Sequence, residues 1–480
     1  MQPKFFGVIL LALAPAIGFG QADGARVIRA GAATSNVTPP IGSLIVGGFI
    51  PFPSTYVHDE LHARCLVLDD GRTRLAVAVV DNIGIPRVVY DEAKRVLQEN
   101  TGIPRENMLM SATHTHSGAS ARGNGHIAGK DPLDDYQRLV VSRILDCMLG
   151  AVQNLEPARI GWGLGREPMQ VFNRRWRMKP GTPLPNPFGG TDQVMMNPRV
   201  ADQNLLEPAG PTDPEIHFLS IQSREGRPMA LLANYSLHYV GGVGKGHISA
   251  DYFALFANRI EEMLGARGQH PQFVAILSNG TSGDINNINF RGDPSGRSWR
   301  PYEKMRTVAN LVAAEVFKAC QTVQHRDWAP LAAAQMEIPM GVRVPTQEQI
   351  EYAERILQKP KNAPKYHPRE DIYAQRVLDM KGWPREIPFL LQALRVGDVG
   401  IAAVPNEVFV DMGLQIKRQS PFPRTFTIEL ANGSYGYLPT VEHHKLGGYE
   451  TWLGTNRLEV EAAPKIVKTI LSLFEKLKSS

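Results

Sequence analysis

Cysteine is scarce in this sequence, which contains only Cys65, Cys147 and Cys320 among its 480 residues. The three lie far apart in apolar surroundings, and no two have the short spacing of a zinc-binding cysteine pair. Any bound metal must therefore be held by histidine and oxygen ligands. An exported protein of this size could form one disulfide between two of these residues, but buried free thiols are the simpler interpretation.

Long runs of a single charge are also absent. The formal net charge is +5, and no stretch contains five or six successive Lys or Arg residues, so the sequence has no footprint of a nucleic-acid partner. The mild positive charge fits peripheral contact with an anionic membrane surface, but a solvated exterior explains it equally well. There is no low-complexity segment and no internal repeat. The hydrophobic fraction of 43% and the charged fraction of 21% are those of a globular protein.

The only long apolar run without charges stands at the N-terminus. Lys4 precedes the apolar residues 5–16, and small residues at 18–20 offer a cleavage point, so residues 1–22 are predicted to be a signal peptide. The run is too short to span a bilayer. The sequence therefore predicts an exported, soluble protein, periplasmic or secreted, in which residues 25–480 form a single domain. A retained N-terminal anchor is the alternative.

Apolar runs of strand length alternate with amphipathic helical segments along the chain. Two of the strand pairs are joined by hairpin signals, at Asp69-Asp70-Gly71 and at Gly397-Asp398. This alternation predicts an α/β fold with a mixed β-sheet core and flanking helices. The charged residues 346–386, with one helix at 347–357, are predicted to be a surface excursion. The main predicted strands are 27–36, 61–68, 75–80, 229–239, 273–277, 389–396, 399–403 and 426–430, and a further strand begins with the apolar run 108–110.

Residues 165–207 show little periodicity and are predicted to be a long loop, which in a compact domain is usually functional or mobile. The loop contains the basic residues Arg174, Arg175 and Arg177. A solvated basic loop is the simpler interpretation, and an arginine that orients a polar group of a substrate is the other.

Two histidines follow the apolar residues Met108 to Met110, at the point where a strand is predicted to end. Side chains two apart on an extended backbone point to the same face, so His114 and His116 are expected to project together into one space. Neutral imidazole is the commonest metal-binding side chain. The alternative is that both histidines only hydrogen-bond to neighbouring loops.

Three further strands end in polar clusters, which contain His238, Asp284 and Glu407, and a fifth ends near Tyr435 and Tyr437. Loops at strand ends bring distant residues together in α/β proteins. Two histidines and one carboxylate are a usual ligand set for catalytic zinc, with one position left for water. Taken singly, Asp284 could organise a turn and Glu407 could cap the following helix.

Residues 111–118 read S-A-T-H-T-H-S-G, which resembles the S-[AG]-T-H-T-H-S-G signature of the neutral/alkaline (non-lysosomal) ceramidases. Similar spaced motifs follow in the same order over most of the mature chain. They are Asn173-Arg174, the strand ending at His238, S-N-x-x-x-G-D before residue 285, Pro405-Asn406-Glu407, Ala431-Asn432, Gly436-Tyr437 and Tyr449-Glu450. The resemblance implies the catalytic-domain fold of this family and a zinc amidohydrolase that cleaves the N-acyl bond of ceramide.

Roles follow from the resemblance position by position. The implied zinc ligands are His114, His238 and Glu407, with Tyr437 as the fourth. The residues expected to contact substrate or the developing oxyanion are His116 and Arg174. Asp284 or His116 could move a proton to the leaving amine. The expected substrate-binding residues are Asn286 and Tyr449.

The chain departs from the family pattern at a position that matters for mechanism. Where the ceramidases have a catalytic serine in G-D-x-S-P-N, this sequence has Asn286, and an amide cannot act as a nucleophile. The tyrosine region reads P-T-V-E-H-H in place of T-T-x-E-E-Y, and the C-terminal β-sandwich of the ceramidases is missing from this sequence. We therefore predict a zinc-dependent hydrolase of a small-molecule or lipid amide that uses a metal-activated water. The alternatives are a zinc hydrolase of a different ester, N-acyl compound or glycoconjugate, and an exported binding protein without catalysis.

Overall fold

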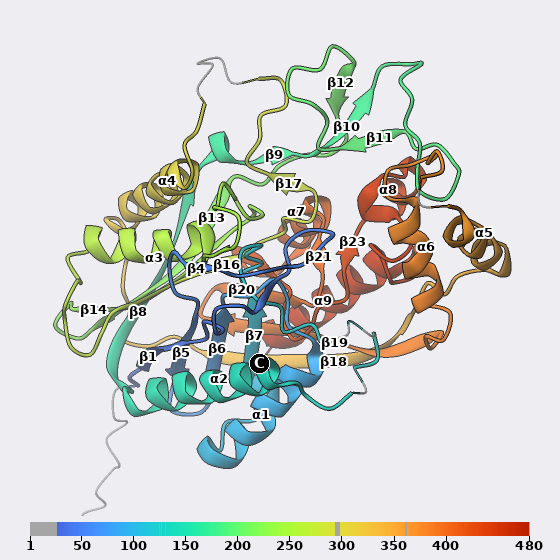
Figure 1. Cartoon of the computed structure of the whole chain (residues 1–480). Helices are drawn as coiled ribbons and strands as arrows, with labels where there is room; N and C mark the ends of the chain where they lie inside the picture. The colour runs from blue at the N-terminus through green and yellow to red at the C-terminus, as the bar shows by residue number, and fades with distance from the viewer. Residues whose placement is uncertain are drawn as a thin grey trace, which may run out of the picture.

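The largest sheet has eight strands in the spatial order β16-β14-β13-β8-β1-β5-β6-β7 (Figure 1). The computed structural model describes residues 26–123, 125, 127–129, 131–292, 298–360 and 362–479, so the predicted signal peptide 1–22 lies outside the described residues. The pairs β6/β7 and β14/β16 are parallel and the other pairs are antiparallel, which confirms the predicted mixed sheet. The strands are β1 (Arg29–Asn36), β5 (His62–Asp69), β6 (Arg74–Val80), β7 (Met108–Ala112), β8 (Glu156–Arg166), β13 (Glu215–Ser223), β14 (Pro228–Tyr235) and β16 (Val274–Asn279).

A second sheet packs face to face against the first. Its order is β18-β19-β20-β22, formed by Leu331–Gly341, Glu386–Val396, Val399–Val404 and Arg424–Glu429. Side chains alternate between the two faces of a strand, so Leu66 of β5 points into the core between the sheets while Val67 points to the opposite side. From the second sheet, Leu394 and Phe426 fill the same inter-sheet core.

Helices cover the outer faces of both sheets, which gives a helix–sheet–sheet–helix arrangement (Figure 1). Helices form between the strands, as the alternation predicted, and a capping box between Asp134 and Gln137 starts the helix Asp135–Gln153. Against the eight-stranded sheet lie α1 (Arg87–Thr101), α2 (Asp135–Gln153), α3 (Asp251–Met263) and α4 (Glu303–Cys320). Against the four-stranded sheet lie α7 (Val410–Gln419) and α9 (Ala462–Ser479).

The seam between the sheets places the polar strand ends near one another. In the strand order of the larger sheet, β7 and β16 are the two opposite edges. They nevertheless contact each other, and β22 of the smaller sheet contacts both. A bridge between Ser111 and Ala431 joins the end of β7 to the chain after β22. The histidine strand β7 and the strand β16 that leads to Asp284 therefore reach the same place, although six strands lie between them in the sheet.

Two segments differ from their sequence-based predictions. The predicted loop 165–207 is partly strand, because it contains β9 (Phe172–Asn173), β10 (Arg175–Met178), β11 (Val194–Met196) and β12 (Leu205–Pro208). The excursion 346–386 holds α5 (Gln347–Gln358), as expected, and a second helix, α6 (Glu370–Asp379). The short strands and the second helix were missed because these stretches are too short and too polar to show a hydrophobic periodicity.

All three cysteines are free thiols, as the simpler interpretation predicted; Cys65 and Cys147 are buried, and Cys320 is partly buried. Within the described part of the chain, none of the helices combines the length and the apolar character needed to cross a membrane.

Lys94 is a buried amine beneath the histidine strand. Its Nζ donates to Asn432 Oδ1 at 2.7 Å, and the same oxygen accepts from the Met110 backbone N–H of β7. Desolvation lowers the pKa of Lys94 to about 7, against about 10.4 for an exposed lysine. The folded protein therefore releases a proton that the unfolded chain keeps between about pH 7 and pH 10, so that rising pH stabilises the fold by up to about 1.4 kcal/mol per pH unit.

Lys94→Met removes this amine and keeps the side-chain volume. We expect the variant to be more stable than wild type at pH 7 and the difference to shrink as the pH rises to 9, because the wild-type amine is then neutral in the fold. Urea unfolding at both pH values measures the free energies. The exposed Lys468 gives the control variant Lys468→Met. A Lys94→Met difference that stays constant with pH would contradict the assignment.

Candidate metal centre

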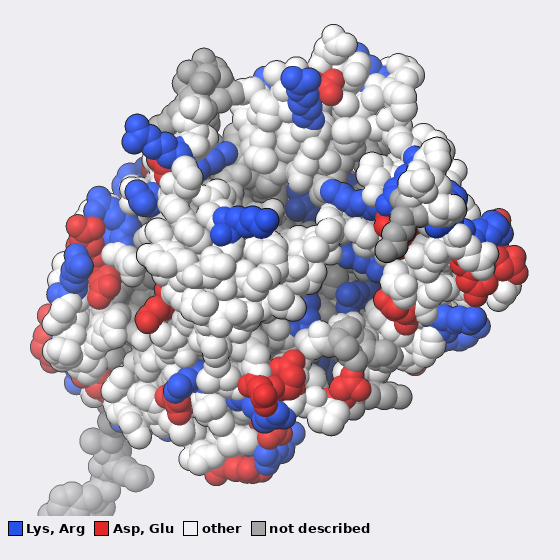
Figure 2. Space-filling view, viewed as in Figure 1, with Lys and Arg blue, Asp and Glu red and all other residues white. Residues whose placement is uncertain are grey.

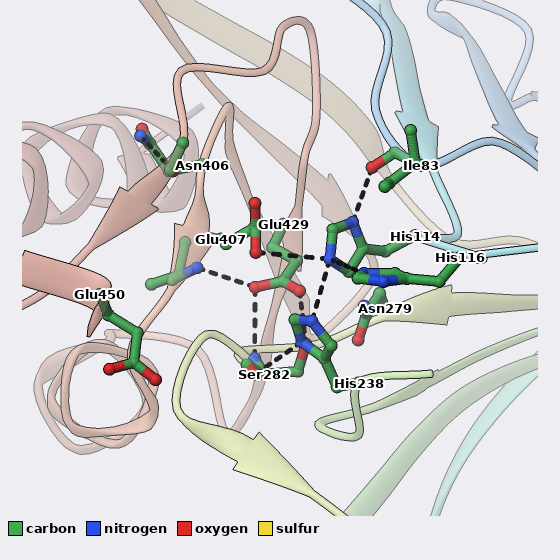
Figure 3. Close-up of polar contacts among 12 residues, drawn as sticks. Ile83, His114, His116, His238, Asn279, Ser282, Asn406, Glu407, Glu429 and Glu450 are labelled. Carbon is green, nitrogen blue, oxygen red and sulfur yellow. Dashed lines mark hydrogen bonds and ion pairs between the residues drawn. The ribbon is translucent and has the colours of Figure 1, made fainter. Parts of the chain in front are cut away.

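Three imidazole rings from two distant segments converge on one point (Figure 3). The His114 Nε2 atom lies 3.0 Å from His238 Nε2 and 3.0 Å from His116 Nε2. Ligand atoms of the three histidines all lie within 4.8 Å of one another, and His114 and His238 are each only 1% exposed. The predicted common projection of His114 and His116 is thus observed, with a third histidine beside them.

The backbone reaches this arrangement by an unusual turn. Strand β7 ends at Ala112, and His114 adopts a φ of 72°, in the left-handed region that few residues other than glycine occupy. Its N–H donates to the Asn82 carbonyl, which holds the turn. Gly47 packs directly on His116, where a Cβ atom would lie 2.0 Å from the His116 carbonyl oxygen. Close packing from both sides therefore fixes the two rings.

The hydrogen bonds on the far side of the rings decide where their lone pairs point. The Nδ1 atom of His114 lies 2.6 Å from the Ile83 carbonyl, and that of His238 lies 3.0 Å from the Ser282 carbonyl, so both Nδ1 atoms carry the proton and donate. The two Nε2 lone pairs then face each other at 3.0 Å. Desolvation lowers the pKa of His116 and His238 well below the usual value and keeps both rings neutral. Facing lone pairs in a buried site are the donor arrangement that a cation stabilises.

Glu407 supplies the carboxylate of this site, and Tyr437 stands opposite it. The two residues are direct partners in the parallel pairing of β21 (Glu407–Val408) with β23 (Tyr437–Leu438). Glu407 Oε2 lies 3.3 Å from His114 Nε2, is buried and has no hydrogen-bond partner among the described residues. Burial alone would raise the pKa of Glu407, but the Arg122 guanidinium and a hydrogen bond from Tyr437 lower it. The carboxylate is therefore ionised and free to bind a cation.

A second buried carboxylate stands behind His238. Glu429 Oε1 accepts from the Ser282 hydroxyl at 2.6 Å, and Glu429 Oε2 accepts from the Val408 N–H at 2.8 Å (Figure 3). Ser282 Oγ lies 3.2 Å from His238 Nδ1. Burial, with Glu407 nearby, raises the pKa of Glu429 well above its usual value. Such outer partners fix the tautomer and orientation of a metal-binding imidazole.

The arginine-rich segment after β9 is buried, so its interpretation as a solvated basic loop is wrong for two of its three arginines. Arg174 is 4% exposed and Arg175 is fully buried. Glu450 is fully buried as well and accepts from Arg174 Nε at 2.9 Å and from Arg175 Nη1 at 2.6 Å. Arg174 Nη2 is buried without a partner among the described residues, and the guanidinium carbon lies 5.2 Å from the Tyr437 ring centroid. Arg174 thus presents one free donor beside the site.

Asp284 lies in a neighbouring polar cluster, not among the three histidines. Its Oδ1 accepts from the Val410 N–H at the start of α7, and its Oδ2 accepts from Asn173 Nδ2. Asp411 and His443 complete this cluster, in which the ligand atoms lie within 4.8 Å of one another. Asp284, and not Glu407, therefore meets the N-terminus of the helix. With both oxygens occupied, Asp284 is better placed to position the loop than to transfer a proton.

Asn286 is engaged within its own loop. Its Nδ2 donates to Asn197 Oδ1 at 2.7 Å, and its Oδ1 accepts from the Ile288 N–H. Gly283, in the same loop, approaches the Glu407 backbone so closely that a Cβ atom would lie 2.6 Å from the Glu407 carbonyl oxygen. The loop is therefore packed against the strand that carries the candidate carboxylate ligand.

Tyr449 connects the site to a small apolar cavity of about 230 Å³. Its ring centroid lies 5.6 Å from that of Tyr437. Part of the cavity wall is formed by His367, Pro368 and Arg369, so the excursion 346–386 borders this cavity. The remaining lining residues are Leu184, Pro185, Asp192, Val194, Met195, Met196, Gly448 and Trp452.

Sequence reasoning missed the residues that hold the ligands in place. They act through a backbone carbonyl or through charge pairs formed across the fold, as with Ile83, Ser282 and Arg122. Two of them left a readable signal, because Glu429 and Glu450 are acids in otherwise apolar or neutral stretches. The sequence could not show which partners would compensate their charges.

No protein-family model matches the chain. Neutral ceramidases B and A of Dictyostelium discoideum are 24% and 23% identical to it over 265 residues, which is 53% of this chain. The match spans about a third of the length of these relatives (34% of each). The solved structure of neutral ceramidase from Pseudomonas aeruginosa has a TM-score of 0.69 at 16% identity, covering 95% of this chain and 75% of that one. A structure described as ceramidase complexed with C2 has a TM-score of 0.70 at 16% identity, and the match covers 95% of this chain and 76% of that one. The fold is that of the neutral ceramidases.

Proposed function

We propose that the protein is a zinc-dependent hydrolase that cleaves an N-acyl, ceramide-like amide bond. The observation that carries the proposal is the pair of Nε2 lone pairs of His114 and His238, which face each other at 3.0 Å beside the ionised Glu407. Two imidazoles and a carboxylate fit the ligand set of catalytic zinc, and Tyr437 is the proposed fourth ligand. Bound zinc would polarise the acyl carbonyl and make a water acidic enough to attack it near neutral pH.

The residues around the ligands supply the remaining functions. Arg174 Nη2, buried and without a partner among the described residues, is placed to donate to the developing oxyanion. His116 is a neutral imidazole stacked on Tyr239 at 3.8 Å between ring centroids, and it is the proposed proton carrier to the leaving amine. Tyr449 and Asn286 are proposed to border the substrate. No serine nucleophile is required, so no acyl-enzyme forms.

Export and peripheral contact with a membrane surface belong to the same proposal. Export follows from the signal-like sequence of residues 1–22. Membrane contact is supported by the loop that packs on His116 through Gly47, because this loop exposes Ile41, Leu44 and Ile50 at 56%, 54% and 74%. Exposed apolar residues in one loop at a site mark a contact surface.

The test combines zinc analysis of the purified protein with turnover of a short-chain fluorescent ceramide. We expect about one zinc per chain. A chelator should abolish the activity, zinc should restore it, and the first turnover should show no burst. Asn286→Ala should lower kcat less than about tenfold, because its side chain holds the loop and does not react.

A burst of the amine product, which would leave the acyl group on the enzyme, would contradict the water mechanism. Stoichiometric zinc without turnover of the ceramide or of any other acyl amide would favour the binding protein. Turnover of other acyl compounds, without ceramide cleavage, would favour the alternative of a zinc hydrolase that acts on a different ester, N-acyl compound or glycoconjugate.

A further inference from the structure

A second and larger cavity, of about 510 Å³, reaches the same site through Arg122. Arg122 Nη2 lies 3.6 Å from Glu407 Oε1, and Arg122 lines the cavity. Its volume lies within the range of small-molecule sites. Apolar side chains such as Ile127 and Ile387 share the lining with the arginines Arg87, Arg122 and Arg457 and with the acids Asp91 and Glu386.

The cavity wall carries donor atoms that the protein does not satisfy. Arg122 Nε, Arg457 Nε and Ser434 Oγ are buried and lack hydrogen-bond partners among the described residues. Ser434 Oγ and Arg122 Nε flank one point of the backbone, since a Cβ atom on Gly84 would lie 2.7 Å and 3.0 Å from them. Unsatisfied buried donors are rare and unfavourable, and the three residues that carry them all line this cavity, which favours an acceptor bound beside them.

Of the three arginines, Arg457 alone has no carboxylate within ion-pair distance among the described residues. Arg87 pairs with Asp91 and Glu337, and Arg122 faces Glu407. Arg457 donates to the Gly125 carbonyl, and within the described residues it pairs with no carboxylate. Desolvation and the nearby Arg122 and Arg376 lower the pKa of Arg457 to about 10, at which it is still charged near neutral pH. On the face shown in Figure 2, several Lys and Arg side chains lie recessed below the surrounding surface.

Resting on the proposed amide hydrolysis, we infer that this arginine-lined cavity binds a carboxylate on the amine part of the substrate, so that the substrate class is an N-acyl amino acid. The Arg457 guanidinium has no carboxylate partner among the described residues and can pair with one from a ligand, and guanidinium–carboxylate pairs are among the stronger polar contacts. The acyl chain would then lie in the apolar cavity beside Tyr449, which has Leu184, Met195 and Trp452 in its wall. The two cavities reach the site through different residues, as the two parts of such an amide require.

The test measures binding without hydrolysis. The probes are the ketone analogues of N-lauroylglycine and N-lauroylethanolamine, in which CH2 replaces the amide NH and no scissile bond remains. They differ only in carboxylate against hydroxymethyl. By calorimetry on the zinc-loaded protein we expect the carboxylate analogue to bind roughly tenfold or more tightly. Arg457→Gln should remove this preference and Arg457→Lys should restore part of it.

Arg326→Gln is the matched control, because Arg326 is exposed, pairs with Asp398 and lies outside the cavity. If Arg457→Gln does not fold, Ser434→Ala tests the same wall and should weaken the carboxylate analogue several-fold. Equal binding of both analogues to the wild type, or tighter binding of the matching phosphate analogue, would overturn the inference. Preferential carboxylate binding without hydrolysis of N-lauroylglycine would support the carboxylate site and reject the proposed amide hydrolysis. Ceramide turnover without this preference would support the amide hydrolysis and reject the carboxylate site.

Discussion

Replacing His114 by alanine is expected to remove zinc from the protein and to lower amide hydrolysis by at least roughly a thousandfold. A metal ion contributes several kcal/mol of transition-state stabilisation, and about 4 kcal/mol corresponds to that factor in rate. His114 has the largest effect because its Nε2 atom contacts His116, His238 and Glu407 alike. Its loss opens the centre of the ligand set.

The variant should stay folded, because deleting the buried imidazole relieves the facing lone pairs, while alanine keeps the backbone at the same φ of 72°. Metal analysis and kcat/KM are measured on the same samples as circular dichroism. His325→Ala is the matched control, since His325 pairs with Ser220 and belongs to no metal group. Full zinc content and full activity in His114→Ala would eliminate the metal centre, whereas retained zinc with lost activity would mean that His114 acts on the substrate.

The sequence predicted the strand ends of the site well and their assembly poorly. His114, His238 and Glu407 follow apolar runs, so their placement at strand ends was readable from local pattern alone. Their convergence depends on the contact between the two edge strands β7 and β16, which β22 completes from another sheet. No local signal reports contacts between the edges of a sheet, because closure depends on twist accumulated over eight strands.

The pairing of Glu407 with Tyr437 illustrates the same limit at shorter range. Their registry follows from two-residue strands, β21 and β23, which are too short to show any periodicity. The assignment of Tyr437 came from the resemblance, and the roles of all the site residues stay predictions until they are measured. The division into a single domain over residues 25–480 likewise stays a prediction.

Buried charges were the least predictable part. The segment with Arg174 and Arg175 looks solvated because composition gives no account of a partner 276 residues further on. Glu450 compensates both guanidinium groups, and burial would otherwise make them very unfavourable. The arginine that is proposed to donate to the oxyanion is therefore held by an acid from the far end of the chain, which couples the stability of the fold to the geometry of the site.

Glu450→Ala is accordingly expected to be the most destabilising single substitution considered, by about 3–5 kcal/mol, because it leaves two buried guanidinium groups without their carboxylate. Glu450→Gln keeps the volume and one acceptor, so its loss should be smaller, about 1.5–3 kcal/mol. Urea unfolding measures both. Glu442→Ala is the matched control, because the Glu442 side chain is 76% exposed beside Lys445 and its pair contributes at most about 0.5 kcal/mol.

The double variant Arg175→Met/Glu450→Ala separates a buried-charge effect from a packing effect. If unpaired charge destabilises Glu450→Ala, then removing one guanidinium should recover part of the lost free energy, and the two substitutions should be far from additive. Arg174 would still lack its anchor, so kcat should stay low in the folded fraction while KM changes little. Additive losses, or a fully active Glu450→Ala, would show that Glu450 neither compensates these arginines nor positions Arg174 for catalysis.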